Sequence, residues 1–173
     1  MTTVKEFMAK ARELLAGGVT DESLHAIGGL LAGSSGAPGF IPDTKMQTLH
    51  GGDSTFTILQ SDPDGLTLML SRFSPHSETP VHDHNSWGVA CVVKGVDRYR
   101  HWEMGDGGRV QILYEKILRP GNFVTWHEPP RDIHSQQGVD GDALELVLFG
   151  RNVMTIPRRY YDPETGDVKT ALP

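Results

Sequence analysis

Cysteine is nearly absent from this chain of 173 residues, which contains only Cys91. A single cysteine cannot form a disulfide within the chain, so the fold must be held by its core alone. A domain of this length buries roughly 70% of the surface that its unfolded chain exposes, which is enough for one stable core. The lack of a disulfide framework fits a reducing compartment, and we expect a single-domain cytoplasmic protein.

Basic charge is also scarce. Lysine and arginine number 16 against 22 aspartates and glutamates, which leaves a formal charge of −6 when the histidines are neutral. The sequence contains no basic tract. Because affinity for nucleic acids depends on many contacts between cations and phosphates, this charge balance predicts that nucleic acid is not a partner.

Long apolar runs are missing as well. No uninterrupted stretch approaches the roughly 20 apolar residues of a membrane-spanning helix. The first residues also lack the charged and then apolar layout of a signal peptide, so we expect no contact with a membrane. The chain instead contains 20 glycines and 11 prolines, and so many turn-forming residues disfavour a long helical bundle.

Residues 1–40 predict an N-terminal helical extension. Apolar residues recur at helical spacing over residues 4–15, and Gly17-Gly18 ends this first helix. A second helix is predicted to start after Thr20 or Asp21 as its N-cap and to run to Leu31. The two helices either cover one face of the remaining protein or form the contact between two copies in a homodimer.

Residues 41–173 predict an all-β domain, because short runs of strand-forming residues alternate with turns of glycine, proline, asparagine and aspartate. The predicted strands cover residues 55–60, 66–73, 87–93, 96–103, 110–118, 123–126 and 143–149. Short strands at a spacing of roughly 8–12 residues indicate an antiparallel sandwich or barrel. The segment after Tyr161 is predicted to be a loosely held extension.

The segment His82-Asp83-His84 gives the sharpest functional signal. In an extended chain alternate side chains point to the same side, so His82 and His84 share a face while Asp83 points away. Two imidazoles ~7 Å apart along a strand can bind one metal ion, although an isolated pair is more often a surface or hydrogen-bonded pair. A third ligand must come from another strand, and His134 follows a proline-rich segment 50 residues after His84.

A longer pattern surrounds these histidines. Residues 80–95, including Trp87-Gly88, resemble the first motif of the thiol dioxygenases of the cysteine dioxygenase type. Residues 120–134 resemble their second motif, and residues 150–166 resemble the closing segment of the bacterial 3-mercaptopropionate dioxygenase-like branch. The resemblance covers roughly residues 55–168. It implies a cupin, a double-stranded β-helix barrel, so the expected fold is all-β with an N-terminal α-helical extension.

The resemblance also implies a metal site. The three iron-ligating histidines of the family carry over onto His82, His84 and His134. The general cupin pattern adds a glutamate where this chain has Gly88 or Val89, so a site without a carboxylate is implied. The implied cofactor is Fe(II), and Ni or Zn could replace it in a purified sample. Three neutral ligands leave coordination positions open for a substrate and dioxygen, and the charge that remains on the site favours an anionic ligand such as a thiolate.

Several family features are missing from this chain. Mammalian members carry a cysteine cross-linked to a tyrosine beside the iron, and the matching position here is Gly88. A Ser-x-His-x-Tyr network is replaced by Glu145, Val147 and Phe149. The arginine or glutamine that holds the substrate carboxylate should lie within residues 55–60, where there is no arginine and Gln60 fits only with a shifted alignment. The resemblance therefore supports the metal site and leaves the substrate pocket undefined.

Four other residues are candidates for the catalytic site. Trp87 is either a pocket wall or an ordinary core residue. His127 is either a fourth ligand or acid–base group, or a residue at the pocket rim or surface. Arg98 and Arg100 share one strand face, and they could anchor a carboxylate if they point inward or remain solvated charges if they point outward. His101 is expected to be a partly buried, hydrogen-bonded histidine without a role.

The resemblance implies a metal-dependent dioxygenase that oxidises a small thiol, of the cysteine or 3-mercaptopropionate type, to its sulfinate with dioxygen. One alternative keeps the three-histidine metal centre but acts on another small substrate, such as a chelating carbonyl compound. A second alternative is a cupin that binds a metal or small molecule without turnover. A hydrolytic zinc site is disfavoured because no general base lies next to His82 and His84.

Overall fold

The computed structural model describes residues 3–42, 46–48 and 53–173. Helices α1 (Val4–Leu15) and α2 (Asp21–Ser34) come first, and strands fill most of the remaining described chain. The strands are β1 (Gln47–Thr48), β2 (Thr55–Ser61), β3 (Thr67–Phe73), β4 (Val81–His82), β5 (Gly88–Lys94), β6 (Asp97–Met104), β7 (Val110–Leu118), β8 (Phe123–Trp126), β9 (His134–Gly138), β10 (Ala143–Phe149), β11 (Arg158–Tyr161) and β12 (Val168–Ala171), with a short 3₁₀ helix η1 at Asp106–Gly108.

Each helix begins at a reciprocal cap. The Thr3 hydroxyl accepts a hydrogen bond from the Glu6 backbone N–H, and the Glu6 carboxylate accepts one from the Thr3 N–H. Thr20 and Ser23 form the same arrangement at α2. Both predicted helices are confirmed, and α2 continues three residues beyond the predicted end. Gly28 suits this helix because a Cβ there would lie 2.3 Å from the ring of Phe123, so only glycine lets α2 pack closely on β8.

The strands form two antiparallel sheets. One, sheet A, has the order β1-β2-β3-β10-β5-β8, and the other, sheet B, has the order β12-β11-β4-β9-β6-β7. The strands β1, β4, β9, β11 and β12 were not predicted. The prediction of a loosely held tail after Tyr161 is wrong, because β12 pairs with β11 along four residues on each strand.

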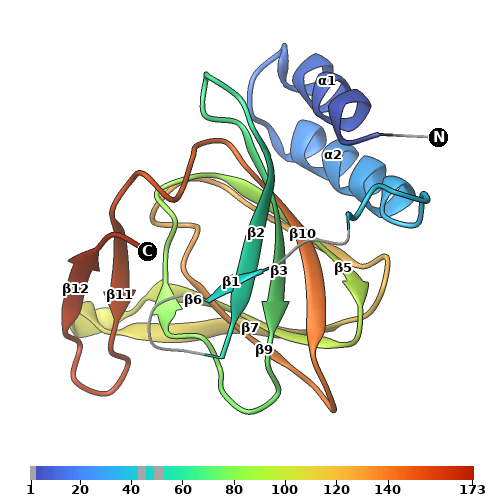
Figure 1. Cartoon of the computed structure of the whole chain (residues 1–173). Helices are drawn as coiled ribbons and strands as arrows, with labels where there is room; N and C mark the ends of the chain where they lie inside the picture. The colour runs from blue at the N-terminus through green and yellow to red at the C-terminus, as the bar shows by residue number, and fades with distance from the viewer. Residues whose placement is uncertain (1–2, 43–45, 49–52) are drawn as a thin grey trace.

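The central strands of sheet A, β3, β10 and β5, are buried on both faces along most of their length. On β10, Leu146 and Leu148 belong to the hydrophobic cluster beneath the helices, while Val147 and Phe149 belong to the cluster inside the barrel. Figure 1 shows α1 and α2 together on one side of the strands β2, β3, β10 and β5. The helices thus cover the outer face of sheet A, and the inner face is left to line the interior.

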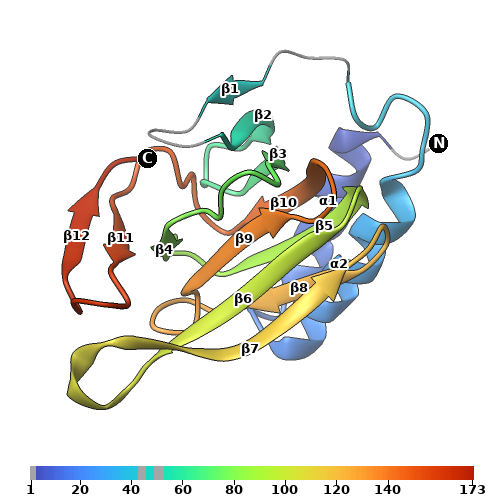
Figure 2. The same cartoon turned by 90° about the horizontal axis from the view of Figure 1, so that it is seen from below.

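Sheet B closes the other side of the barrel. Figure 2 shows β4 and β9 on the side of the barrel away from α1 and α2, and a long β6–β7 hairpin that projects from it. The outer strand β7 is mostly exposed, including Ile112, Leu113 and Ile117. No helix within the described residues is both long and apolar enough to cross a membrane.

Candidate metal centre

Three histidines converge inside the barrel: His82 and His134 lie on strands of sheet B, and His84 lies in the segment that follows β4. His82 on β4 lies directly opposite His134 on β9, so both side chains point to the same face of the sheet. His84 follows two residues after His82 and returns to that face. The Nε2 atoms of His82 and His84 lie 3.2 Å apart, and those of His84 and His134 lie 3.3 Å apart. All three side chains are buried.

Backbone carbonyl groups orient two of the rings. His82 Nδ1 lies 2.8 Å from the Pro80 carbonyl oxygen, and His134 Nδ1 lies 2.9 Å from the Asp132 carbonyl oxygen. A carbonyl only accepts, so each Nδ1 carries the hydrogen and each Nε2 presents a lone pair. Both Nε2 atoms face His84 Nε2 at little more than 3 Å, and a cation placed among the three atoms could accept all of their lone pairs. The donor atoms therefore fit a metal ion, and the three histidines form a group that could hold one.

Burial keeps these imidazoles neutral. Removal from water, reinforced by the positive charge of Arg158, lowers the pKa of His82 to about 3. The same causes hold the pKa of His84 well below its ordinary value. Burial and the nearby His82 do the same to the pKa of His134. Neutral imidazole is the form that binds metals, so the ligands need not lose protons at neutral pH.

Hydrogen bonds and an ion pair hold the segment from His82 to His84 on both sides. Asp83 points away from the cavity and is fully buried, and its carboxylate accepts hydrogen bonds from the Arg159 N–H at 2.9 Å and from the Tyr161 hydroxyl at 2.9 Å. It also pairs with Arg159 Nε at 2.6 Å. On the other side, the Asp132 carboxylate accepts a hydrogen bond from the His84 N–H at 3.1 Å. These contacts fix the strand that carries two ligands against both of its neighbours.

The histidines line a cavity of about 190 Å³ whose two walls come from different sheets. The wall from sheet B is polar and carries His82, His134, Gln136, Arg158 and Tyr160. The wall from sheet A is mostly apolar and carries Met69, Ser71, Phe73, Trp126, Val147 and Phe149. The connecting segments add Ser54, Ser77, Glu78, Thr79, Pro80, His84 and Val153, and the last residue Pro173 also contributes.

Arg158 is the cationic group of the cavity, and sequence reasoning missed it as a site residue. Its side chain is only 5% exposed, and its Nε has no hydrogen-bond partner among the described residues. Its neighbour Arg159 takes the Asp83 carboxylate instead. A buried guanidinium without a direct carboxylate partner would gain from an anion bound in the cavity. The sole hint in the sequence was the Arg158-Arg159 doublet, which does not tell which arginine points inward.

Trp126 fills the wall next to the ligands. Its ring centroid lies 5.1 Å from that of His134 and 6.4 Å from that of His84, and its Nε1 donates to the Ser86 carbonyl at 3.1 Å. A Cβ on Gly88 would lie 2.2 Å from the Trp126 ring. The indole therefore occupies the space where a side chain at position 88 would extend.

The three positions that replace the Ser-x-His-x-Tyr network take two different roles. Val147 and Phe149 line the cavity as apolar groups. Glu145 is fully buried and accepts a hydrogen bond from Gln136 Nε2 at 2.7 Å, and the same amide lies 3.3 Å from Asp97 Oδ2. Gln136 lines the cavity, so its amide connects the cavity wall to a pair of buried carboxyl groups.

Trp87, His127 and His101 do not line the cavity among the described residues. Trp87 belongs to the cluster beneath the helices and packs against Gly150, as expected for an ordinary core residue. His127 pairs with Asp21 at the start of α2, so it is a surface contact between β8 and that helix. His101 is buried but stacks on Tyr114 rather than forming a hydrogen bond through Nδ1.

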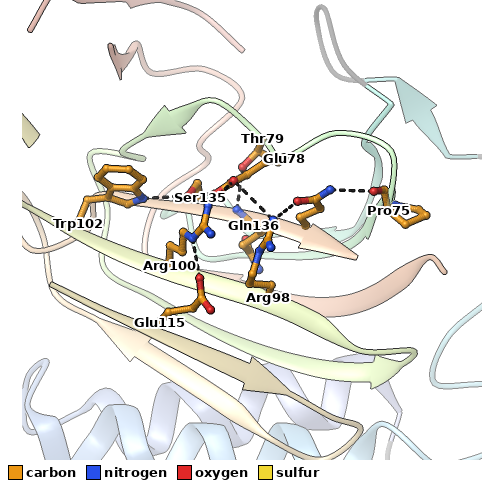
Figure 3. A network of polar contacts seen from close by, with 10 residues as sticks. Pro75, Glu78, Thr79, Arg98, Arg100, Trp102, Glu115, Ser135 and Gln136 are labelled. Carbon is orange, nitrogen blue, oxygen red and sulfur yellow. Dashed lines mark hydrogen bonds and ion pairs between the residues drawn. The ribbon is translucent and has the colours of Figure 1, made fainter. Parts of the chain in front are cut away.

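Arg98 and Arg100 do not line the cavity among the described residues, so of the two alternatives left open by the sequence the outward one applies. Figure 3 shows both on β6, together with Glu78 and Ser135. Arg100 pairs with Glu78 at 2.6 Å and with Glu115 at 2.7 Å, while Arg98 bonds to Gln137 and lies 3.8 Å from Glu78. Both arginines thus fasten the segment that joins β3 to β4, which forms part of the cavity wall.

Comparisons with known proteins support the fold. No family model matches the chain. A single-stranded DNA-binding protein of Deinococcus radiodurans is 33% identical over 85 residues, which cover 49% of this chain. The chain spans only 28% of the length of that relative.

Solved structures match over a larger part of the chain. The DMSP lyase DddQ from Ruegeria pomeroyi matches 69% of this chain and 62% of its own, with a TM-score of 0.52 and 16% identity. Peruvianin-I, a cysteine peptidase from Thevetia peruviana latex, matches 67% of this chain and 78% of its own, with a TM-score of 0.51 and 16% identity. A cupin-like protein from Thermotoga maritima matches 66% of this chain and 80% of its own, with a TM-score of 0.46 and 20% identity. At these identities the likeness concerns the fold alone, and that fold is the expected all-β barrel with an N-terminal helical extension.

Proposed function

We propose that this protein is a metal-dependent dioxygenase that oxidises a small thiol bearing a carboxylate to its sulfinate with dioxygen. One observation supports the proposal: three neutral imidazoles with converging Nε2 atoms share a small cavity with a buried arginine whose Nε has no hydrogen-bond partner among the described residues. The partners of the protein are then a small molecule and dioxygen.

His82, His84 and His134 would hold the ion, and we propose Fe(II) because thiol oxidation by dioxygen requires a redox-active metal. When bound, the ion supplies the redox chemistry and the positions where sulfur and dioxygen meet. The protein contributes binding, orientation and the exclusion of water. Its ligands are neutral and Arg158 is cationic, so the site as a whole attracts a substrate with both a thiolate and a carboxylate.

Arg158 is the group that would orient the substrate. Its guanidinium can hold a carboxylate through two parallel hydrogen bonds, which fixes direction as well as position. Arg158 follows the loop that ends the barrel and lies on β11, which pairs directly with the ligand strand β4. The anchor and the metal site are therefore fixed in one sheet.

Tyr160 carries a hydroxyl on the cavity wall beside the metal ligands. It lies directly opposite His82 in the β4–β11 pairing, lines the cavity, and places its ring centroid 6.1 Å from that of His82. The Phe149 side chain carries no hydroxyl on the facing wall. We therefore assign to Tyr160 the hydrogen bond to bound substrate that Phe149 cannot give.

Oxygen consumption by Fe(II)-loaded protein tests the proposal. We expect uptake with 3-mercaptopropionate or cysteine that matches sulfinate formation, and little uptake with a thiol of similar size that lacks a carboxylate. Arg158→Met should raise KM for the carboxylate thiol and leave the weak reaction of the uncharged thiol unchanged. The absence of both oxygen uptake and sulfinate from fully loaded protein would contradict thiol dioxygenation.

A three-histidine centre that acts on a different small substrate remains the second candidate. The apolar side chains Val147 and Phe149 favour it, because they remove hydrogen-bonding groups from the wall that faces the ligands. In the same assay this candidate predicts oxygen uptake with chelating carbonyl compounds and no sulfinate from thiols.

A further inference from the structure

The Gln136 side chain joins the cavity to a pair of carboxyl groups behind its wall. Gln136 lines the cavity and is only 5% exposed. Its Nε2 donates to Glu145 Oε2 at 2.7 Å and to Asp97 Oδ2 at 3.3 Å, and both carboxyl groups are fully buried. An amide nitrogen carries two hydrogens, so each carboxyl group can accept one of them.

This pairing decides which end of the amide faces the cavity. Burial and mutual proximity raise the pKa of both Asp97 and Glu145, so the pair keeps a proton between its members and offers lone pairs to the Gln136 nitrogen. Among the described residues no group donates to Gln136 Oε1, and this atom is not sealed from solvent as the partnerless Oε1 of Glu145 is. The oxygen end of the amide is therefore left to the cavity.

The backbone of Gln136 is fixed as well. Its N–H donates to the Thr79 hydroxyl at 3.0 Å (Figure 3), and its carbonyl accepts from the Thr79 N–H at 2.9 Å. Rotation of the side-chain amide would set its oxygen against the two carboxyl groups and leave their lone pairs without a donor. The Gln136 carbonyl oxygen is thus an acceptor that does not turn to suit a ligand.

Other polar groups on the cavity wall lack this fixed polarity. The hydroxyl groups, which belong to serines, Thr79 and Tyr160, rotate and can either donate or accept. The Glu78 carboxylate is already engaged by Ser135 and by Arg100, each at 2.6 Å. A fixed acceptor costs free energy when a ligand displaces water from it and supplies no hydrogen in return.

We propose that Gln136 gives the cavity a preference for ligands that carry a hydroxyl group, and that Glu145 and Asp97 are positioning residues that hold its amide. Glu145 occupies the serine position of the Ser-x-His-x-Tyr network that the resemblance implies, so this support is not part of that network. For the proposed oxidation, the inference adds a hydroxyl group to the expected substrate and rests on the proposed function for its reaction. The preference itself belongs to the cavity and is measurable without turnover.

Two carboxylates of nearly the same shape test this preference by calorimetry on the Zn²⁺-loaded protein, in which the metal is not redox-active. At the same carbon atom, 4-hydroxypentanoate offers a donor and 4-oxopentanoate offers only an acceptor. The hydroxy compound should bind about tenfold more tightly, as expected when a buried acceptor keeps or loses its donor. Equal binding, tighter binding of the oxo compound, or no binding of either would overturn the proposal.

Two variants separate the contact from its support. Gln136→Leu removes the acceptor, and the ratio of the two affinities should fall to near one. Glu145→Gln keeps the shape of the side chain but brings an amide that can donate as well as accept, so the Gln136 amide is free to turn and the ratio should fall well below its wild-type value. A purely structural role of Glu145 would weaken both compounds alike and leave the ratio unchanged, which would overturn its positioning role.

Gln111→Leu is the matched control, because Gln111 is exposed on β7 and bonds to Glu103 rather than lining the cavity. It should leave both affinities unchanged. If Gln136→Leu does not fold, the wild-type ratio still decides the inference. A high ratio without sulfinate formation from thiols would support the preference and overturn the proposed reaction, whereas sulfinate formation with a ratio near one would do the reverse.

Discussion

Asp97 and Glu145 form a pair of buried carboxyl groups joined by the Gln136 amide. Burial raises the pKa of Asp97 from its ordinary value of 3.8 to about 7. Burial and the nearby Asp97 also hold the pKa of Glu145 well above its usual range. The folded state therefore binds a proton here that the unfolded chain releases at lower pH.

This linkage predicts how Asp97 affects stability. A carboxyl with a raised folded-state pKa stabilises the fold fully below its unfolded value, and that contribution is lost as pH rises through about 7. Each pH unit between these limits should remove up to about 1.4 kcal/mol. Urea denaturation of metal-free wild type and Asp97→Asn from pH 4 to 8 measures the effect. As the pH rises from 4 to 8, wild type should lose stability relative to Asp97→Asn. Parallel curves of unfolding free energy against pH would exclude the linkage.

Individual site residues differed in how well the sequence indicated them. His82 and His84 were found because their spacing is local, and His134 followed from the resemblance. Arg158 could not be distinguished from Arg159, since only the pairing of β11 with β4 decides which of them enters the cavity. The sequence left open whether Trp87 lines the pocket, and the structure places Trp126 at the ligands instead.

At the scale of elements, burial on both faces explains which strands could be predicted. The strands of sheet A beneath the helices are rich in apolar and strand-forming residues, and β2, β3, β5 and β10 were each predicted within one residue of their bounds. The strand β9 has the sequence His-Ser-Gln-Gln-Gly and is nevertheless mostly buried. Its polar side chains face the cavity or the hydrogen-bonded group around Glu78. Strands of this kind carry the site and lack the hydrophobic signal that sequence analysis depends on.

The contact between β5 and β8 gives a prediction at this scale. Gly88 lies directly opposite Trp126, and a Cβ there would overlap the indole. Gly88→Ala should therefore destabilise the fold by about 1–3 kcal/mol and displace the ring that packs on the ligands. Gly29→Ala is the matched control, because that exposed position has no atoms within 4 Å of a Cβ and lies within α2.

The control should stabilise the protein by about 0.5–1 kcal/mol, as expected for alanine in a helix. Thermal denaturation of both variants compares the two effects. Equal stability of Gly88→Ala and wild type would show that Trp126 does not occupy this space in solution.

At the scale of the whole molecule, the position of the helical extension on the barrel explains the character of the cavity. The helices bury the outer face of sheet A, so its inner face is free to form the apolar wall of a cavity. Sheet B then supplies the polar wall, and the ligand strand β4 lies between its neighbours β9 and β11. The resemblance anticipated the barrel and the three histidines, but the division of the cavity between two sheets depends on the register of strands far apart in the chain.

The central claim is that His82, His84 and His134 hold one metal ion. Equilibrium dialysis of wild type, His134→Ala and His101→Ala against Fe(II) or Zn(II) tests it most directly. His101 is the control because it pairs with His134 on the neighbouring strand but lies outside the converging group. Wild type and His101→Ala should bind one ion per chain. His134→Ala should bind the ion more than about 100-fold more weakly, because loss of a residue that only supports a ligand already costs up to about 100-fold. Unchanged metal binding by His134→Ala, or an equal loss in His101→Ala, would contradict the account.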